Sequence, residues 1–253
     1  MLVPTLAVLT AAGSGTRLGL DLPKALVELD GLPLLLHAAR RLCVSGVVDV
    51  LVVTTPPGLR DHVADLLHDD PALDRPVRAV EGAGTRQASV AAGLRAGLAE
   101  DLTATVGGPV DVVLVHDAAR PLAPPALVRR VVEAVRAGHD AVVPGLPVAD
   151  TIKRVAPPGA GDASGAEPVV ATVDRSVLRA VQTPQGFARD LLEQAHAAAA
   201  DRADDEASAA TDDAGLVEAL GRTVHVVPGD AAAAKITTAH DLRVAALTLR
   251  EER

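Results

Sequence analysis

The 253-residue sequence contains one phenylalanine and no tryptophan or tyrosine. Its core must therefore be packed with alanine, valine and leucine, which fill space without needing buried hydrogen-bond partners. Aromatic stacking is the usual way in which proteins hold the bases of single-stranded nucleic acid. The scarcity of aromatic residues therefore argues against that mode of binding.

Positive charge is also scarce. The chain has 24 lysines and arginines against 33 aspartates and glutamates, a net charge of −9. Binding to nucleic acid or to an anionic membrane needs a basic face, so both classes of partner are disfavoured. A nucleotide substrate is still compatible with this balance, because a few cations in one cleft can oppose its phosphates.

Cysteine and long apolar runs are nearly absent. The single cysteine, Cys43, excludes a disulfide framework within the chain and is typical of a reducing compartment. No stretch reaches the ~20 apolar residues of a membrane span. Residues 1–10 are apolar but follow no Lys or Arg, so a strand explains them better than a signal peptide does. We expect a cytoplasmic protein.

Short apolar segments rich in β-branched residues alternate with helical patterns. Near-continuous apolar runs such as residues 50–53 are typical of strands buried on both faces, as in a parallel sheet. We expect strands at residues 6–9, 47–54, 77–80, 110–116, 141–143 and 224–227, and helices at 34–44, 124–138, 188–200 and 239–250. The alternation predicts an α/β fold with a Rossmann-like, three-layer, mostly parallel sheet, as a single domain over residues 1–253.

The pattern changes after residue 148. Residues 151–155 and 169–173 resemble strands, and the Gly- and Pro-rich residues 156–165 between them carry no core-forming side chain. We therefore predict a β-hairpin arm at about residues 150–174 that projects from the domain. Because a bare hairpin is marginally stable in water, the arm should pack on something, and a second subunit is the natural candidate.

The most informative segment is Leu-Thr-Ala-Ala-Gly-Ser-Gly-Thr-Arg-Leu-Gly at residues 9–19, followed by a Pro-Lys pair that ends at Lys24. Gly13 and Gly15 allow a sharp turn that exposes N–H groups to phosphate oxygens. Arg17 adds a planar donor fork and Lys24 a mobile point charge. The segment lacks the Gly-Lys-Ser/Thr of a Walker A loop, and its third glycine comes one residue too late for a nicotinamide-dependent dehydrogenase. A plain strand-to-helix turn is the alternative.

A second segment, His116-Asp117-Ala-Ala-Arg120-Pro, follows an apolar strand. Its acidic residue would lie at the carboxyl edge of the sheet, where open α/β folds bind ligands. Such a carboxylate can hold Mg²⁺ against nucleotide phosphates. Alternatively, Asp117 caps the next helix or pairs with Arg120. Adjacent His-Asp pairs also occur in metal phosphohydrolases, but these need further ligands, so we interpret His116 as structural.

A third segment, residues 82–90, is a turn that opens into a helix. The N-terminal amides after Gly82 and the hydroxyl of Ser89 could contact a base or a ribose. Taken alone, this segment could also be no more than a helix cap.

Together these segments resemble the family of 2-C-methyl-D-erythritol 4-phosphate cytidylyltransferases, the CTP-using enzymes of the non-mevalonate isoprenoid pathway. The resemblance covers nearly the whole chain. It includes Ala11-Ala12-Gly13-x-Gly-x-Arg17, Pro23-Lys24, Arg86-Gln87-x-Ser89-Val90, Asp117-Ala118-Ala119-Arg120, Asp150-Thr151-Ile152-Lys153, Thr172-Val173-Asp174-Arg175, Gln182-Thr183-Pro184-Gln185, Thr211-Asp212-Asp213 and Lys235-Ile236-Thr237. A related family that uses ribitol 5-phosphate shares much of this pattern, but Asp-Ala-Ala-Arg is more typical of the methylerythritol enzymes.

The resemblance implies transfer of CMP from CTP to methylerythritol phosphate, with release of pyrophosphate. It implies that Arg17 and Lys24 bind the triphosphate and that Asp117 helps to hold Mg²⁺. Cytosine and ribose would be surrounded by Ala11, Ala12, Gly13, Gly15, Gly82 and Ser89, and the second substrate would be bound by Thr151, Arg175 and Lys235. Catalysis would rest on Arg17, Lys24, Arg175 and Lys235. In the family the arm reaches across a homodimer, so Thr151 and Arg175 would serve the neighbouring subunit's site.

The sequence departs from the family pattern in two places. Ala232 and Ala233 stand where the family usually has Asp and Asn, and the turn of the arm is longer than expected. Two other hypotheses remain open at this point. The chain could be a nucleotidyltransferase for ribitol 5-phosphate or a different NTP, or a non-catalytic nucleotide-binding subunit. Retention of Arg17, Lys24 and Asp117 argues against the latter, because charges held close together are costly to keep.

Overall fold

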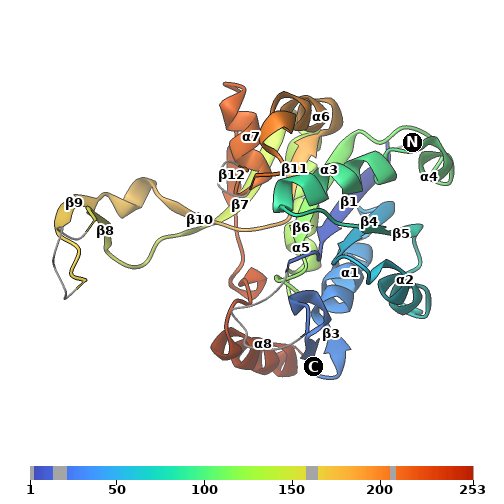
Figure 1. Ribbon diagram of the computed structural model, residues 1–253, viewed down its shortest axis with the longest axis horizontal. Coiled ribbons are helices and arrows are strands. Elements are labelled where there is room, and N and C mark those ends of the chain that lie inside the picture. Colours follow the sequence, from blue (N-terminus) through green and yellow to red (C-terminus); the bar gives the residue numbers. More distant parts are fainter. Residues whose placement is uncertain (1–2, 14–21, 158–164, 206–208, 253) are drawn as a thin grey trace.

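The computed structural model describes residues 3–13, 22–157, 165–205 and 209–252 (Figure 1). Its centre is a twisted sheet with the strand order β10-β7-β11-β6-β1-β4-β5. A further strand, β12, also pairs with β7. The strands are β1 (Thr5–Thr10), β4 (Val50–Thr55), β5 (Val77–Glu81), β6 (Val112–Asp117), β7 (Ala141–Pro147), β10 (Arg179–Val181), β11 (Gln185–Ala188) and β12 (His225–Pro228).

Most neighbouring strands are parallel, as predicted. β1 pairs in parallel with β4 and β6, β4 with β5, and β12 with β7. The exceptions are β11, which lies antiparallel between β6 and β7, and β10, which is antiparallel to β7. The predicted strands are confirmed with shifts at their ends. β7 runs four residues beyond the predicted 141–143 because its last three residues pair with β10.

Helices cover both faces of the sheet, which gives the predicted three layers (Figure 1). One apolar core joins the sheet to α1, α2 and α5, and a second joins its other face to α3, α4, α6 and α7. The helices are α1 (Leu34–Val44), α2 (Arg60–His68), α3 (Arg86–Gly97), α4 (Glu100–Ala104), α5 (Pro125–Arg136), α6 (Arg189–Ala198), α7 (Asp213–Ala219) and α8 (Ala239–Glu251). None of those in the described part of the chain has the length and apolar character needed to span a bilayer.

Small residues let the layers approach closely in this aromatic-poor core. A Cβ placed on Gly93 of α3 would lie 2.5 Å from a methyl carbon of Val8 in β1. The one phenylalanine, Phe187, is fully buried in β11, beside Gly186, where a Cβ would lie 2.5 Å from a methyl carbon of Val131. Because such contacts leave no room for even a methyl group, glycine is required at both positions.

The predicted arm is present as β8 (Ile152–Val155) paired antiparallel with β9 (Val169–Val173), and it projects away from the sheet (Figure 1). A short 3-10 helix, η3 (Arg175–Val177), leads back towards β10. The remaining elements are η2 (Lys24–Leu26), β2 (Glu28–Leu29), β3 (Leu32–Pro33), η4 (Ala200–Arg202) and η5 (Ala231–Ala233).

Candidate active site

The carboxyl end of β6 places Asp117 at the edge of the sheet, as the sequence predicts. It lies in register with Thr10 at the end of β1, whose hydroxyl is 3.3 Å from Asp117 Oδ1. The Asp117 side chain is 10% exposed. Its carboxylate therefore lies where the two parallel strands β1 and β6 end side by side, which is the usual ligand position in open α/β folds.

Two cations hold this carboxylate. Lys235 Nζ lies 2.8 Å from Asp117 Oδ2, and Arg86 Nε lies 3.4 Å from Oδ1. Burial alone would raise the pKa of the Asp117 carboxyl, but the charges of Arg86 and Lys235 outweigh burial and keep that pKa well below its usual range. Asp117 is therefore an ionised carboxylate at any physiological pH. Of the two alternatives considered for it, pairing with Arg120 is replaced by pairing with Arg86 and Lys235.

Lys235 reaches Asp117 because its own loop is tied to the segment that follows β6. The backbone N–H of Ile236 donates to the carbonyl of Ala119 at 2.8 Å. Earlier in the same loop, the carbonyl of Ala233 accepts a hydrogen bond from the Arg120 guanidinium at 2.8 Å. Ala233 is one of the two alanines that depart from the family pattern. It is fully buried, and its carbonyl is the acceptor in this hydrogen bond. The alanines remove polar side chains but leave this backbone support in place.

A second group of predicted residues meets beside β1 and β4. The N–H of Ala11 donates to Thr54 O at 3.0 Å, and the N–H of Gly82 donates to Thr55 O at 2.8 Å. A Cβ on Gly82 would lie 2.5 Å from the Cβ of Ala12. The loops after β1 and β5 are therefore in direct contact. Glycine and alanine let the two backbones come this close, so a base or a ribose could approach the backbone groups here.

Ser89 holds the loop after β5 in place. Its buried hydroxyl lies 2.8 Å from Thr85 O and accepts a bond from Ala83 N at 3.0 Å. Thr85 caps α3 by accepting from Ala88 N. The helix-cap interpretation is therefore right for Thr85. Ser89 organises the loop through these two bonds.

Replacing Gly82 with alanine should disturb this contact. The new methyl group would crowd the Ala12 side chain and lie 2.9 Å from Thr55 O. We expect a loss of about 1–3 kcal/mol in unfolding free energy, as for overpacked sites, and weaker binding of the nucleotide that the sequence resemblance predicts. Gly84→Ala is the matched control, because no described atom lies within 4 Å of a Cβ there. Denaturant unfolding and steady-state kinetics would measure both effects, and equal behaviour of the two variants would contradict the assignment.

His116 is structural, as expected. It is 1% exposed, and its ring nitrogens lie 2.9 Å from the Thr183 hydroxyl and 3.2 Å from Arg120 O. Burial lowers the pKa of its imidazole to about 4, so the ring is neutral near pH 7. It therefore has neither the charge nor the exposure of a catalytic acid.

Comparison with known proteins identifies the family of this chain. Residues 5–251 match the family model described as IspD: 2-C-methyl-D-erythritol 4-phosphate cytidylyltransferase. The chain belongs to this family. Relatives named 2-C-methyl-D-erythritol 4-phosphate cytidylyltransferase include one from Streptomyces avermitilis, 46% identical over 98% of this chain and 93% of its own length, and one from Saccharopolyspora erythraea, 50% identical over 96% and 98%.

Solved structures of the IspD family have the same fold. The 2-C-methyl-D-erythritol 4-phosphate cytidylyltransferase of Thermus thermophilus is 36% identical, with a TM-score of 0.68 and coverage of 99% of this chain and 100% of that chain. The 4-diphosphocytidyl-2C-methyl-D-erythritol synthase of Anaerococcus prevotii is 28% identical, with a TM-score of 0.77 over 98% and 99%. The resemblance inferred from motifs is confirmed.

The other residues predicted from IspD motifs fall into three groups. Lys24 opens η2, half-buried, with Ala25 and Leu26 of that helix anchored in the core. Thr151 and Arg175 lie in the exposed arm, where Arg175 donates to the carbonyl of Ala149. Gly15 and Arg17 lie outside the described residues, and Gly13 is the last residue described before them.

Sequence reasoning missed three contributors. Thr10 lies beside Asp117. Arg86 contacts Asp117 and also pairs with the buried Asp213, whose Oδ2 lies 2.7 Å from Arg86 Nη1. Arg86 and Asp213 both lie in motifs that carry the family resemblance, so the motifs marked them without indicating a role. Thr10 could have been found from its place at the end of β1, directly before the glycine loop.

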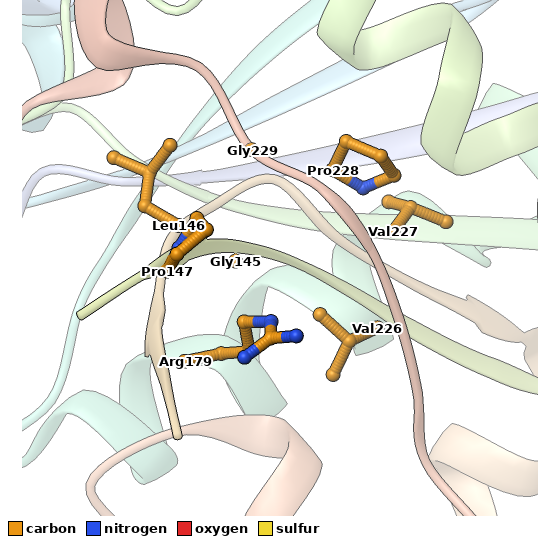
Figure 2. A pocket seen from close by; sticks show the side chains of 8 residues that line it. All are labelled: Gly145, Leu146, Pro147, Arg179, Val226, Val227, Pro228 and Gly229. Carbon is orange, nitrogen blue, oxygen red and sulfur yellow. The ribbon is translucent and has the colours of Figure 1, made fainter. Parts of the chain in front are cut away.

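The cavity in Figure 2 lies elsewhere, at the root of the arm. It measures about 420 Å³ and is lined by Gly145, Leu146, Pro147, Arg179, Val226, Val227, Pro228 and Gly229, from β7, β10 and β12. Apart from Arg179, its side chains are apolar. It contains none of the predicted site residues, so it is a feature of the arm's base and not of the carboxyl edge around Asp117.

Proposed function

We propose that this protein transfers CMP from CTP to the phosphate of 2-C-methyl-D-erythritol 4-phosphate and releases pyrophosphate. The observation that carries this proposal is Asp117, an ionised carboxylate between Arg86 and Lys235 at the end of β6. It stands in a chain that matches the IspD family from residue 5 to 251. Cys43, buried and with no second cysteine in the chain, supports a cytoplasmic location.

The chemistry needs no general base. With a second pKa near ~6, a phosphate monoester is mostly dianionic at neutral pH and is already a nucleophile. One of its oxygens forms a bond to the α-phosphorus of CTP, the bond from that phosphorus to the bridging oxygen breaks, and the electron pair leaves on pyrophosphate. The neutral, fully bonded His116 agrees with a reaction that transfers no proton.

Charge is the main obstacle to the reaction. Two unit charges ~4 Å apart repel by about 4 kcal/mol at an effective dielectric near 20. Lys235 can turn from Asp117 towards a phosphate, because its side chain is 43% exposed. Lys24 and Arg17 would bind the triphosphate and so bring the α-phosphorus into line with the incoming oxygen.

Asp117 also fits a metal site of the kind that Mg²⁺ uses. Magnesium is commonly held by one or two carboxylates together with substrate phosphates. Within the described residues there is no group of three or more His, Cys, Asp or Glu side chains that would form an all-protein site. When bound, Mg²⁺ would neutralise charge on the phosphates, and Asp117 would hold it there.

A turnover assay tests the proposed function. Pyrophosphate release would be followed with CTP and methylerythritol phosphate, with and without Mg²⁺. We expect release that requires both substrates and the metal. Each other NTP, and ribitol 5-phosphate, would be substituted in turn. Turnover with ribitol 5-phosphate and none with methylerythritol phosphate would overturn the assignment.

We further propose that the arm assembles a homodimer. Three of its valines are largely exposed, Val155 at 42%, Val169 at 58% and Val170 at 54%, and so is Val177 of the adjoining η3, at 76%. A projecting two-stranded hairpin with such a surface gains stability when it packs on another chain. The paired variant Val169→Glu/Val170→Glu should therefore shift the mass measured by light scattering from dimer to monomer.

Arg175→Ala should mainly weaken binding of the sugar phosphate. The exposed guanidinium would be offered by the arm to the partner's site and would align the attacking phosphate. We expect a raised KM for methylerythritol phosphate and little change in CTP affinity. Arg154→Ala, which removes the same charge from the same exposed arm, is the control. A selective loss of CTP binding in Arg175→Ala would contradict this role.

A further inference from the structure

A line of alternating charges runs from Asp117 back into the helices behind the sheet. Arg86, the first residue of α3, joins Asp117 at 3.4 Å to Asp213 at 2.7 Å. Asp213 is the first residue of α7, and its second oxygen lies 2.9 Å from Nε2 of His196 on α6. These ion pairs and this hydrogen bond therefore link three helices that cover the same face of the sheet.

The far end of this line is the most deeply buried. The side chains of Asp213 and His196 are 1% and 7% exposed, against 23% for Arg86. A buried carboxylate is costly unless it is paired and hydrogen-bonded. Burial raises the pKa of Asp213, but the opposing effects of Arg86 and His196 are larger and the pKa is lowered overall. Asp213 is therefore a fixed anion with one oxygen for each partner.

The geometry makes Asp213 the residue that orients Arg86. The contact of Arg86 with Asp213 is shorter than its contact with Asp117, by 2.7 Å against 3.4 Å. Because a guanidinium is rigid and planar, fixing Nη1 on Asp213 also fixes the direction in which Nε points. His196 occupies the other Asp213 oxygen. Its Nε2 must carry the hydrogen, since an ionised carboxylate only accepts.

We propose that His196 and Asp213 are positioning residues for nucleotide transfer, which orient Arg86 so that it holds Asp117 ready for the metal–nucleotide complex. This inference rests on the proposed function. Neither residue touches the reacting atoms. They act through Arg86, as outer-shell partners commonly orient the groups that bind a metal.

A cavity beside His196 makes this role testable. It measures about 600 Å³ and lies between α3 and α6, with Ala91, Leu94 and Ala197 among the residues that line it together with His196. The Nδ1 atom of His196 is buried and has no hydrogen-bond partner among the described residues. Removing this side chain therefore takes one hydrogen-bond donor away from Asp213. It also enlarges a space that a small molecule can enter.

The first experiment compares His196→Gln with His196→Leu. Glutamine keeps an N–H donor that can reach Asp213, and leucine does not. In His196→Leu we expect kcat/KM for CTP to fall about 10- to 100-fold, as outer-shell losses do. The half-saturating Mg²⁺ concentration should rise, and the KM for methylerythritol phosphate should stay near the wild-type value. His196→Gln should recover most of the loss.

The second experiment is chemical rescue of His196→Ala at mildly alkaline pH. Added imidazole can enter the cavity and donate an N–H to Asp213, whereas neutral 1-methylimidazole has no N–H to donate. We expect imidazole to restore activity and 1-methylimidazole not to. Leu192→Ala is the control for a purely structural effect, because Leu192 is fully buried on the same helix and outside the line of charges. It should lower Tm without changing the Mg²⁺ dependence.

Two results would overturn the inference. One is a His196→Gln variant as impaired as His196→Leu. The other is a loss of activity that follows Tm in the same way as in Leu192→Ala, with no difference between the two imidazoles. These results are distinct from failure of the proposed function, in which the wild-type protein itself would not turn over CTP and methylerythritol phosphate.

Discussion

Replacing Asp117 with asparagine should reduce kcat/KM by about three orders of magnitude or more. Asparagine keeps the shape of the side chain but loses the charge that would hold Mg²⁺, and metal-assisted charge stabilisation is worth several kcal/mol. Each 1.36 kcal/mol is a factor of about ten in rate. Steady-state kinetics over a Mg²⁺ titration would measure the effect. Activity within tenfold of the wild-type value would remove Asp117 from the mechanism.

The same substitution should cost some stability, because Arg86 and Lys235 would lose their shared anion. Breaking a fully buried pair costs about 3–5 kcal/mol. We expect less here, since the half-exposed Lys235 can be hydrated. The double variant Asp117→Asn/Lys235→Met should recover stability but not activity. This comparison separates the chemical role of the carboxylate from its contribution to folding.

Replacing Lys24 with alanine should lower turnover by about 10²-fold or more while leaving the fold intact. Loss of one preorganised charge at a developing transition state typically costs this much. The fold should survive because the backbone bonds of η2 and the burial of Ala25 and Leu26 do not depend on the lysine side chain. Rapid-quench or pyrophosphate-release kinetics would give kcat, and circular dichroism would report folding.

Two matched variants make the Lys24 result specific. Lys24→Arg keeps the charge but replaces a compact ammonium with a planar fork, so we expect an intermediate rate. Arg60→Ala removes a charge from the exposed start of α2 and should leave kcat unchanged. A near-normal kcat in Lys24→Ala would show that this lysine takes no part in the reaction.

Positive side chains gather around Asp117 at the carboxyl end of β6, although the chain as a whole is acidic. Arg86 and Lys235 contact Asp117, and the charge of Arg120 also lowers the pKa of its carboxyl. That a few such cations suffice to bind a nucleotide, whatever the net charge of −9, stays a prediction. Arg86 is held on both Asp117 and Asp213 before any substrate arrives, so its position needs little reorganisation.

The sequence pattern did not predict β10, β11 or α7, because local composition carries no signal for them. The antiparallel strands β10 and β11 have three and four residues, too few to show a periodic pattern. Helix α7 begins within the acidic residues 201–213, which resemble a solvated segment. Yet Asp213 is buried there, because Arg86 and His196, distant in sequence, satisfy its charge. Partners of this kind are invisible to local composition.

The sequence by itself determined the alternation of strands and helices, the family, and the chemical type of most site residues, because these depend on local spacing and residue identity. Only the tertiary structure decided that Asp117 pairs with Lys235, 118 positions away, and that Arg86 connects it to Asp213, 127 positions from Arg86. Such distant residues meet because the parallel strands bring their carboxyl ends to one edge and α3, α6 and α7 pack together behind it.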